Sequence, residues 1–139
     1  HAQLAQSDID RLDKQWRRER KQGGSSLIDS VLNNPLSNYL LNVASQAGGL
    51  YAEIFIMDNK GLNVGQSAIT SDYWQGDEAK WKRTYLQGPD SVFIDGVEYD
   101  ESASRFQIQV SVPVVDPNTQ SVIGAATLGL AMRQLALRE

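Results

Sequence analysis

The chain has 139 residues, and its 13 basic and 17 acidic side chains give a formal net charge of −4. This length suits one compact domain, and the acidic balance disfavours nucleic acid, whose binding requires clustered lysines and arginines. Because the chain has no cysteine and its one histidine is His1, we expect no thiol chemistry, no metal site, no cofactor and no enzymatic activity.

The N-terminal third is predicted to be helical. Its first segment, residues 1–25, carries a narrow apolar stripe at helical spacing and ends at Gly23-Gly24. The stripe consists of Ala5, Ile9, Leu12 and Trp16. We expect this helix, capped at Ser7, to pack on the domain or to pair with a second copy of itself. A second helix is predicted from Ser26 and a third from Pro35.

Strand periodicity begins after the third helix. Alternating apolar residues predict a largely buried strand over residues 50–57. The turn at 58–61, whose glycine supplies a positive φ, joins it to a returning strand over 62–67. A crossover helix is then expected over the aromatic-rich residues 73–85.

The last third is predicted to be mostly strand. Asp95-Gly96 indicates a tight turn, and hence a hairpin over residues 92–99. Clean alternation predicts a long central strand over 105–115, a further strand follows over 122–130, and a short helix ends the chain over 132–138. This order favours an α+β domain with a central antiparallel sheet of about five strands and helices on its face.

Three motifs occur in order along residues 26–130. They are the turn region Ile56–Val64, the segment Thr70–Trp81, and the strand pair Val110–Val114 with Ile123–Gly129. Together they resemble the PAS-like extracytoplasmic sensor domains called Cache or PDC. The resemblance implies a single sensor domain over 26–139 that lies in the periplasm or otherwise outside the cytoplasmic membrane. It also implies a domain that binds a small polar organic solute and contributes to signal transduction.

The resemblance also bears on the partners of the chain. Family members commonly sit between two membrane helices of a histidine kinase, chemoreceptor or cyclase, and some are solitary exported proteins. Because no stretch approaches the roughly 18 apolar residues of a membrane span, we expect an excised ectodomain or a solitary periplasmic protein, and the ends at His1 and Glu139 favour the second. The expected partners are a small-molecule ligand, a second copy through the first helix, and a membrane-bound signalling partner or the rest of a receptor.

Candidate ligand contacts lie in residues 70–85, called the crossover segment, and on the polar face of the long strand. In amino-acid-binding relatives this segment opens with an Arg-x-Trp-Tyr pattern that holds the ligand carboxylate, but here Ser71 replaces the arginine. The candidates are Asp72, Tyr73, Trp74, Asp77, Trp81, Gln107, Gln109 and Ser111. The aspartates and aromatic rings suit a cation, whereas Lys80 and Arg83 suit an anion, so organic acids, amines and amino-acid-like compounds all stay open.

Other interpretations of the same residues stay open as well. If Trp74 and Trp81 are core aromatics, the chain is a non-catalytic interaction or dimerisation module of the same fold without a ligand. The acidic run over residues 90–101 matches no calcium-loop spacing and is expected to be a solvated edge. An enzyme that used Asp72 and Asp77 would lack a base, a phosphate loop and a nucleophile elbow.

Overall fold

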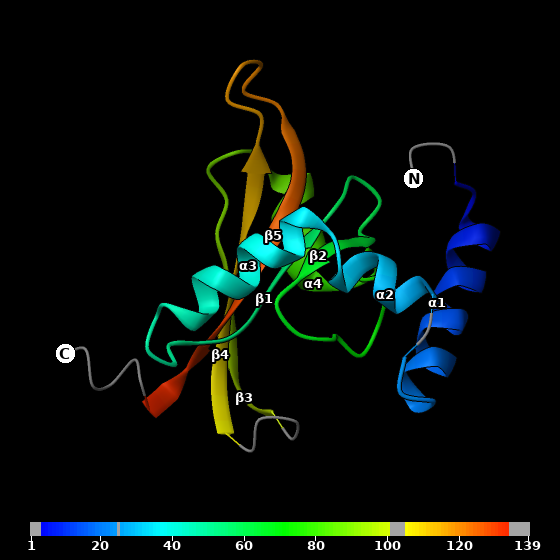
Figure 1. Ribbon diagram of the computed structural model, residues 1–139. Helices are drawn as coiled ribbons and strands as arrows, with labels where there is room; N and C mark the ends of the chain where they lie inside the picture. Colours follow the sequence, from blue (N-terminus) through cyan, green and yellow to red (C-terminus); the bar gives the residue numbers. More distant parts are fainter. Residues whose placement is uncertain (1–3, 25, 101–104, 134–139) are drawn as a thin grey trace.

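The computed structural model describes residues 4–24, 26–100 and 105–133. In this part of the chain, N-terminal helices lie beside a five-stranded sheet (Figure 1). The short helix predicted for residues 132–138 falls almost wholly outside the described residues, as does Glu101 of the acidic run.

The three predicted N-terminal helices form, and they are α1 (Gln6–Lys21), α2 (Ser26–Leu32) and α3 (Pro35–Ser45). The capping residue of α1 is Ala5, slightly before the expected Ser7, and its backbone N–H donates to Oδ2 of Asp8 at 3.2 Å. Asn34 caps α3, since its Oδ1 accepts from the backbone N–H of Ser37 at 2.8 Å. A polar cap directly before a proline therefore begins α3 where the sequence predicts it.

The sheet has five antiparallel strands in the order β2-β1-β5-β4-β3 within the described ranges. They are β1 (Tyr51–Met57), β2 (Asn63–Gln66), β3 (Phe93–Asp100), β4 (Arg105–Val115) and β5 (Val122–Ala131). The β1–β2 turn forms as predicted, because Oδ1 of Asp58 accepts from the N–H groups of Lys60 and Leu62 at 2.9 and 3.0 Å. Gly61 takes a φ of 84° there. The α+β class with a central antiparallel sheet is confirmed.

The hairpin predicted over residues 92–99 is wrong. β3 runs through Asp95-Gly96, since Ile94 and Val97 both pair with β4 and a bulge takes up the two residues between them. β4 is long enough to pair with both halves of β3, and the ladder hydrogen bonds outweigh the local turn preference of Asp-Gly. The strand therefore bulges where the sequence predicts a turn.

The crossover helix predicted over residues 73–85 is also wrong, because the connection contains only α4 (Ala79–Lys82) and the 3-10 turn η1 (Tyr85–Gln87). The N–H of Gln75 donates to the carbonyl of Gly61 at 2.8 Å, so this part of the backbone pairs with the β1–β2 turn. The carbonyl of Tyr73, which in a helix would accept from the N–H of Asp77, accepts instead from the N–H of Asn63 at 3.0 Å. The connection is therefore extended before α4.

Helices lie on both sides of the sheet (Figure 1). α3 contacts β1 and β2 on one face, whereas Trp81 of α4 packs on Phe55, Met57 and Ala125 on the other. A separate apolar cluster joins α1 to α2 and to the crossover segment, and its buried members are Ile9, Trp16, Ile28, Val31, Leu62 and Tyr73. The predicted apolar stripe of α1 thus packs on the domain itself.

Candidate functional site

The polar face of β4 is turned into the protein. Gln107, Gln109 and Ser111 are 2%, 5% and 1% exposed, whereas Phe106 on the opposite face is 56% exposed. In an antiparallel sheet with one wet face, the polar side chains normally meet the water. The reversed arrangement shows that the crossover segment covers a polar surface, which needs hydrogen-bonding partners.

A cavity of about 440 Å³ lies over this polar face. Its walls come from the C-terminal half of α1, the segment over residues 69–80, and strands β1, β3 and β4. The lining residues are Arg20, Glu53, Phe55, Ile69, Thr70, Ser71, Gln75, Glu78, Lys80, Glu98, Tyr99, Gln107 and Gln109. A space of this volume matches the range of small-molecule sites in proteins.

Hydrogen bonds in the cavity centre on Gln107. Its Nε2 donates to Oε2 of Glu53 and to Oε1 of Glu98, each at 3.2 Å, and so links β1 to β3 across β5 and β4. The Oε1 atoms of Gln75, Gln107 and Gln109 are buried and have no hydrogen-bond partner in the described part of the protein. Buried polar groups are rarely left unpaired, so these oxygens mark places for a donor.

The cavity walls carry charges of both signs. Lys80 lies 3.7 Å from Oε1 of Glu78 and 5.5 Å from the centre of the Phe55 ring. Burial raises the pKa of the Glu78 carboxyl, an effect that Lys80 partly offsets. With three glutamates against Arg20 and Lys80, the described walls have a small formal excess of negative charge.

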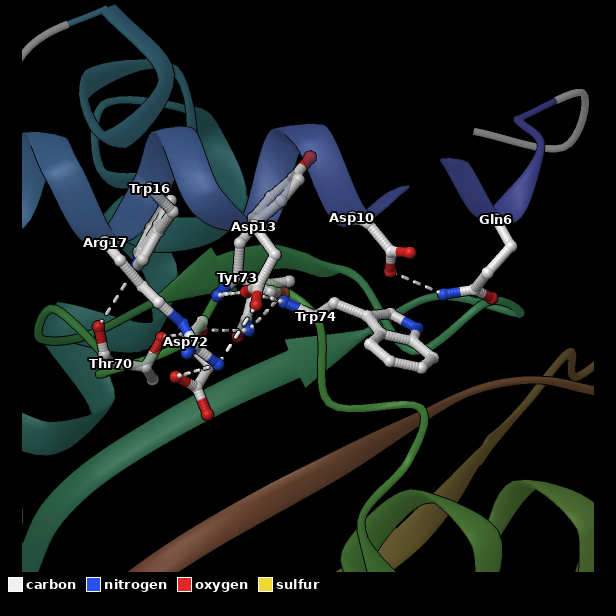
Figure 2. Close-up of polar contacts among 10 residues, drawn as sticks. Gln6, Asp10, Asp13, Trp16, Arg17, Thr70, Asp72, Tyr73 and Trp74 are labelled. Atoms are coloured by element: carbon white, nitrogen blue, oxygen red, sulfur yellow. Dashed lines mark hydrogen bonds and ion pairs between the residues drawn. The ribbon is translucent and has the colours of Figure 1, made fainter. Parts of the chain in front are cut away.

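One wall of the cavity is fastened to α1 (Figure 2). Oδ1 of Asp13 accepts from the backbone N–H groups of Tyr73 and Trp74, at 2.9 and 3.0 Å. The indole N–H of Trp16 donates to the carbonyl of Thr70 at 2.9 Å, and its ring stacks on Tyr73 with centres 5.3 Å apart. Trp16 is fully buried, so this contact is a fixed part of the fold.

An ion pair network covers the same junction. The guanidinium of Arg17 lies 3.1 Å from Oδ2 of Asp13 and 3.2 Å from Oδ1 of Asp72. Burial raises the pKa of Asp72, Arg17 opposes the shift, and the charges of Asp13 and Asp77 add to it. Asp72 therefore faces α1 and is engaged by Arg17.

The structure separates the predicted ligand contacts into two groups. Gln107 and Gln109 line the cavity, and Ser111 lies further along the same face, where its hydroxyl is 2.8 Å from that of Thr127. The predicted contacts of the crossover segment are outside the lining, and they are Asp72, Tyr73, Trp74, Asp77 and Trp81.

The two tryptophans of the crossover segment hold it to the β1–β2 turn. Nε1 of Trp74 donates to the carbonyl of Lys60 at 2.8 Å, and Nε1 of Trp81 donates to the carbonyl of Asp58 at 3.0 Å. Their indole N–H groups are thus engaged by the backbone.

Several lining residues were missed by sequence reasoning. Glu53 is a charged residue at an inward position of a buried strand, a signal that could have identified it. Arg20 is one of many basic residues of α1, and Gln75 lies in the segment wrongly predicted to be helical. Nothing in the local pattern distinguishes these two.

No group of three or more potential metal ligands occurs among the residues that the structure describes. None of the helices described is long and apolar enough to cross a membrane.

No protein-family profile matches the sequence, and no curated protein matches it. Among solved structures, the fold is similar to the sensor domain of the V. cholerae histidine kinase DctB, with 13% identity and a TM-score of 0.51 over 73% of this chain and 38% of that one. It is also similar to the sensory domain of the Campylobacter jejuni chemoreceptor Tlp3 with isoleucine bound, with 12% identity and a TM-score of 0.53 over 93% and 54% of the two chains.

A third similar structure is the ligand-binding domain of the Pseudomonas aeruginosa PAO1 amino acid chemoreceptor PctC in complex with GABA. The two chains are 15% identical and superpose with a TM-score of 0.52, over 89% of this chain and 56% of the PctC domain. The chain thus spans between 38% and 56% of the lengths of these three domains.

Proposed function

Because the chain has the fold of PDC or Cache sensor domains, we propose that it is an extracytoplasmic sensing module that binds a small polar organic solute. The single observation that carries this proposal is the polar cavity over β4, with its unpaired glutamine oxygens. A cavity of this kind fixes the orientation of a solute through a few polar groups. The similar sensor domains of histidine kinases and chemoreceptors support a role in signal transduction.

The route of the signal in this proposal runs through α1. Thr70 and Ser71 line the cavity. Trp16 donates to the carbonyl of Thr70 itself, and Asp13 holds the nearby N–H groups of Tyr73 and Trp74. Arg20 of the same helix also reaches the cavity. A solute that moves this wall would therefore move α1, provided that it binds two arrangements of the wall with different affinity.

The proposal assigns residues 26–139 to the sensor domain and residues 1–25 to the coupling helix. Pairing of two copies through α1 would use its outward faces, because Ile9 and Trp16 are buried against α2 and the crossover segment. A receptor partner in the membrane would then respond to the position of α1.

A thermal-shift screen of the full chain tests the proposal, using small organic acids, amines, amino acids and purines, with calorimetry on every hit. A bound solute raises the melting temperature in proportion to the logarithm of its concentration once it exceeds Kd. Failure of all classes to shift the melting temperature would contradict solute binding and favour the ligand-free interaction module.

A pair of glycine variants ties any hit to the cavity. A Cβ at Gly129 would collide with Oε1 of Gln107 and approach Cγ of Glu53, so Gly129→Ala should weaken binding at least tenfold. Gly96 is open, with no atom within 4 Å of such a Cβ, so Gly96→Ala should bind as the unmodified chain does. Equal binding by both variants would place the solute elsewhere.

A further inference from the structure

Two residues of β3 lie outside the sheet ladder. Asp95 and Gly96 form the bulge between the residues that pair with Val110 and Ile108, and neither is paired with a residue of β4. In the described ranges β3 is the last strand of the sheet, so no further strand lies along its outer side. The backbone of this bulge is therefore not fixed by strand pairing on either side.

The backbone nitrogen of Gly96 lies beside the side chain of Asp95. Its N–H donates to Oδ1 of Asp95 at 2.8 Å, whereas in a regular antiparallel ladder such a group donates to a carbonyl of the neighbouring strand. Gly96 is exposed, and apart from its chain neighbours no described atom lies within 4 Å of the position that a Cβ would take. An amide nitrogen and a carboxyl group are thus held in contact without a side chain between them.

An amide nitrogen in contact with the carboxyl group of the preceding residue can close a five-membered ring with it. Reacting groups that are held in contact react far faster than separate ones, because the entropy of bringing them together has already been lost in folding. Glycine hinders this approach least, since it has no Cβ. The bulge therefore brings together the two groups of one reaction.

Asp90 provides a comparison within the same chain. It is exposed and is followed by another small residue, Ser91. The backbone N–H of Ser91 donates to the carbonyl of Gly88 at 3.2 Å, so this nitrogen is engaged by the backbone. The fold should therefore hinder ring closure at Asp90 and not at Asp95.

We propose that Asp95-Gly96 is a site of isoaspartate formation in the folded protein. The nitrogen of Gly96 forms a bond to Cγ of Asp95, and its proton leaves with the hydroxyl of the protonated carboxyl group as water. The product is a succinimide ring, which a water molecule then opens. Cleavage of the bond from nitrogen to the side-chain carbonyl restores aspartate, and cleavage of the bond from nitrogen to the main-chain carbonyl yields isoaspartate. The water lost in the first step is regained in the second, so the mass of the chain is unchanged.

The modification would lengthen β3 next to the cavity. In isoaspartate the main chain runs through Cβ and Cγ, which adds one carbon to the backbone within the bulge. Beyond the bulge, Glu98 pairs with Gln107, and its Oε1 accepts from Nε2 of Gln107 at 3.2 Å. The added carbon therefore lies shortly before a glutamate that lines the cavity.

Incubation of the full chain at neutral pH and physiological temperature, both folded and in urea, tests the proposal. Isoaspartate is quantified at each aspartate in proteolytic peptides by electron-transfer mass spectrometry. Because each site is compared with itself, the effect of the following residue on the rate cancels. At Asp95 the folded chain should form isoaspartate at least as fast as the unfolded chain, whereas at Asp90 it should form it at least tenfold more slowly. A folded rate below the unfolded rate at Asp95, or equal ratios at the two aspartates, would overturn the proposal.

Two variants test the ring closure itself. Gly96→Ala places a Cβ in open space beside the nitrogen, so the fold should be kept while isoaspartate formation at Asp95 falls at least tenfold. Asp95→Asn closes the same ring with loss of ammonia, so it should convert to a mixture of aspartate and isoaspartate faster than the unmodified chain isomerises. Unchanged isoaspartate formation in Gly96→Ala, or a stable side-chain amide in Asp95→Asn, would overturn the proposal.

Discussion

Replacement of Asp13 tests whether α1 is held to the cavity wall by the contacts that the structure shows. In Asp13→Ala the backbone N–H groups of Tyr73 and Trp74 lose one shared carboxylate acceptor, at 2.9 and 3.0 Å. Hydrogen bonds to a charged group contribute about 1.5 to 3 kcal/mol each, and partial access of water reduces the sum. We expect a loss of about 3 kcal/mol in the free energy of unfolding.

Two matched variants separate the hydrogen bonds from the ion pair. Asp13→Asn keeps an oxygen acceptor without the charge, so it should lose about half as much as Asp13→Ala. Arg17→Ala removes two ion pairs, with Asp13 and with Asp72, of an arginine that is 58% exposed, and such surface pairs contribute about 0.5 kcal/mol each. The expected order of destabilisation is therefore Asp13→Ala, then Asp13→Asn, then Arg17→Ala.

Urea denaturation followed by far-ultraviolet circular dichroism measures the three losses. The slope of the free energy against urea should stay constant, because α1 remains docked through Trp16. A loss below about 1 kcal/mol in Asp13→Ala, or an equal loss in Arg17→Ala, would refute the view that Asp13 fastens α1 to the cavity wall.

Three further predictions concern the same region. Burial and the charge of Asp58 raise the pKa of Tyr73 from 10.0 to about 12, so between these values the unfolded chain ionises first and stability falls as the pH rises. Urea denaturation at several pH values should show a fall of about 3 kcal/mol in the free energy of unfolding that Tyr73→Phe lacks. Equal pH profiles of the two proteins would contradict this prediction. Burial raises the pKa of Glu78 above 4.5, so the folded state keeps this proton more readily than the unfolded chain, and stability falls as the pH rises above 4.5. In the same assay, the free energy of unfolding of Glu78→Gln should therefore increase relative to that of the unmodified chain from pH 4 to pH 7. Trp81→Phe should lose about 1.5 kcal/mol in urea denaturation, because the carbonyl of Asp58 loses its indole donor at 3.0 Å, and no loss would show that water replaces the bond.

Local patterns were sufficient for most of the fold. Asn34-Pro35 marks the start of α3 because the capping side chain and the proline act within one turn of chain. The long strand β4 follows from strict alternation, which depends only on its own residues. Such elements are predictable since the interactions that define them are close in sequence.

The errors occur where distant partners decide the conformation. Aromatic residues recur at helical spacing over 73–85, but the carbonyl of Tyr73, which the helix would need as an acceptor, is taken by the N–H of Asn63. Asp95-Gly96 carries a turn signal, but β4 pairs with the residues on both sides of it, and the two residues form a bulge instead. Neither partner is visible within a local window of sequence.

The candidate site shows the same division. The shared face of Gln107 and Gln109 follows from the period of a strand, whereas their burial depends on a cover that comes from residues 69–80 and α1. Arg20 reaches the cavity only because α1 docks through Trp16. The polar residues that β4 contributes to the cavity are therefore predictable from sequence, whereas those contributed by residues 69–80 and α1 are not.

The placement of the apolar clusters explains why the cover is suited to respond to a solute. One cluster joins α1 and α2 to Tyr73, and another lies beneath Trp81, so the crossover segment is anchored at both residues. The cavity surface under Thr70 and Gln75 is polar and contributes little burial of apolar area. A solute that satisfies the unpaired oxygens would add its interactions at this less stabilised stretch. In the proposed function, the contacts of Asp13 and Trp16 with this segment are the route by which a change there would reach α1.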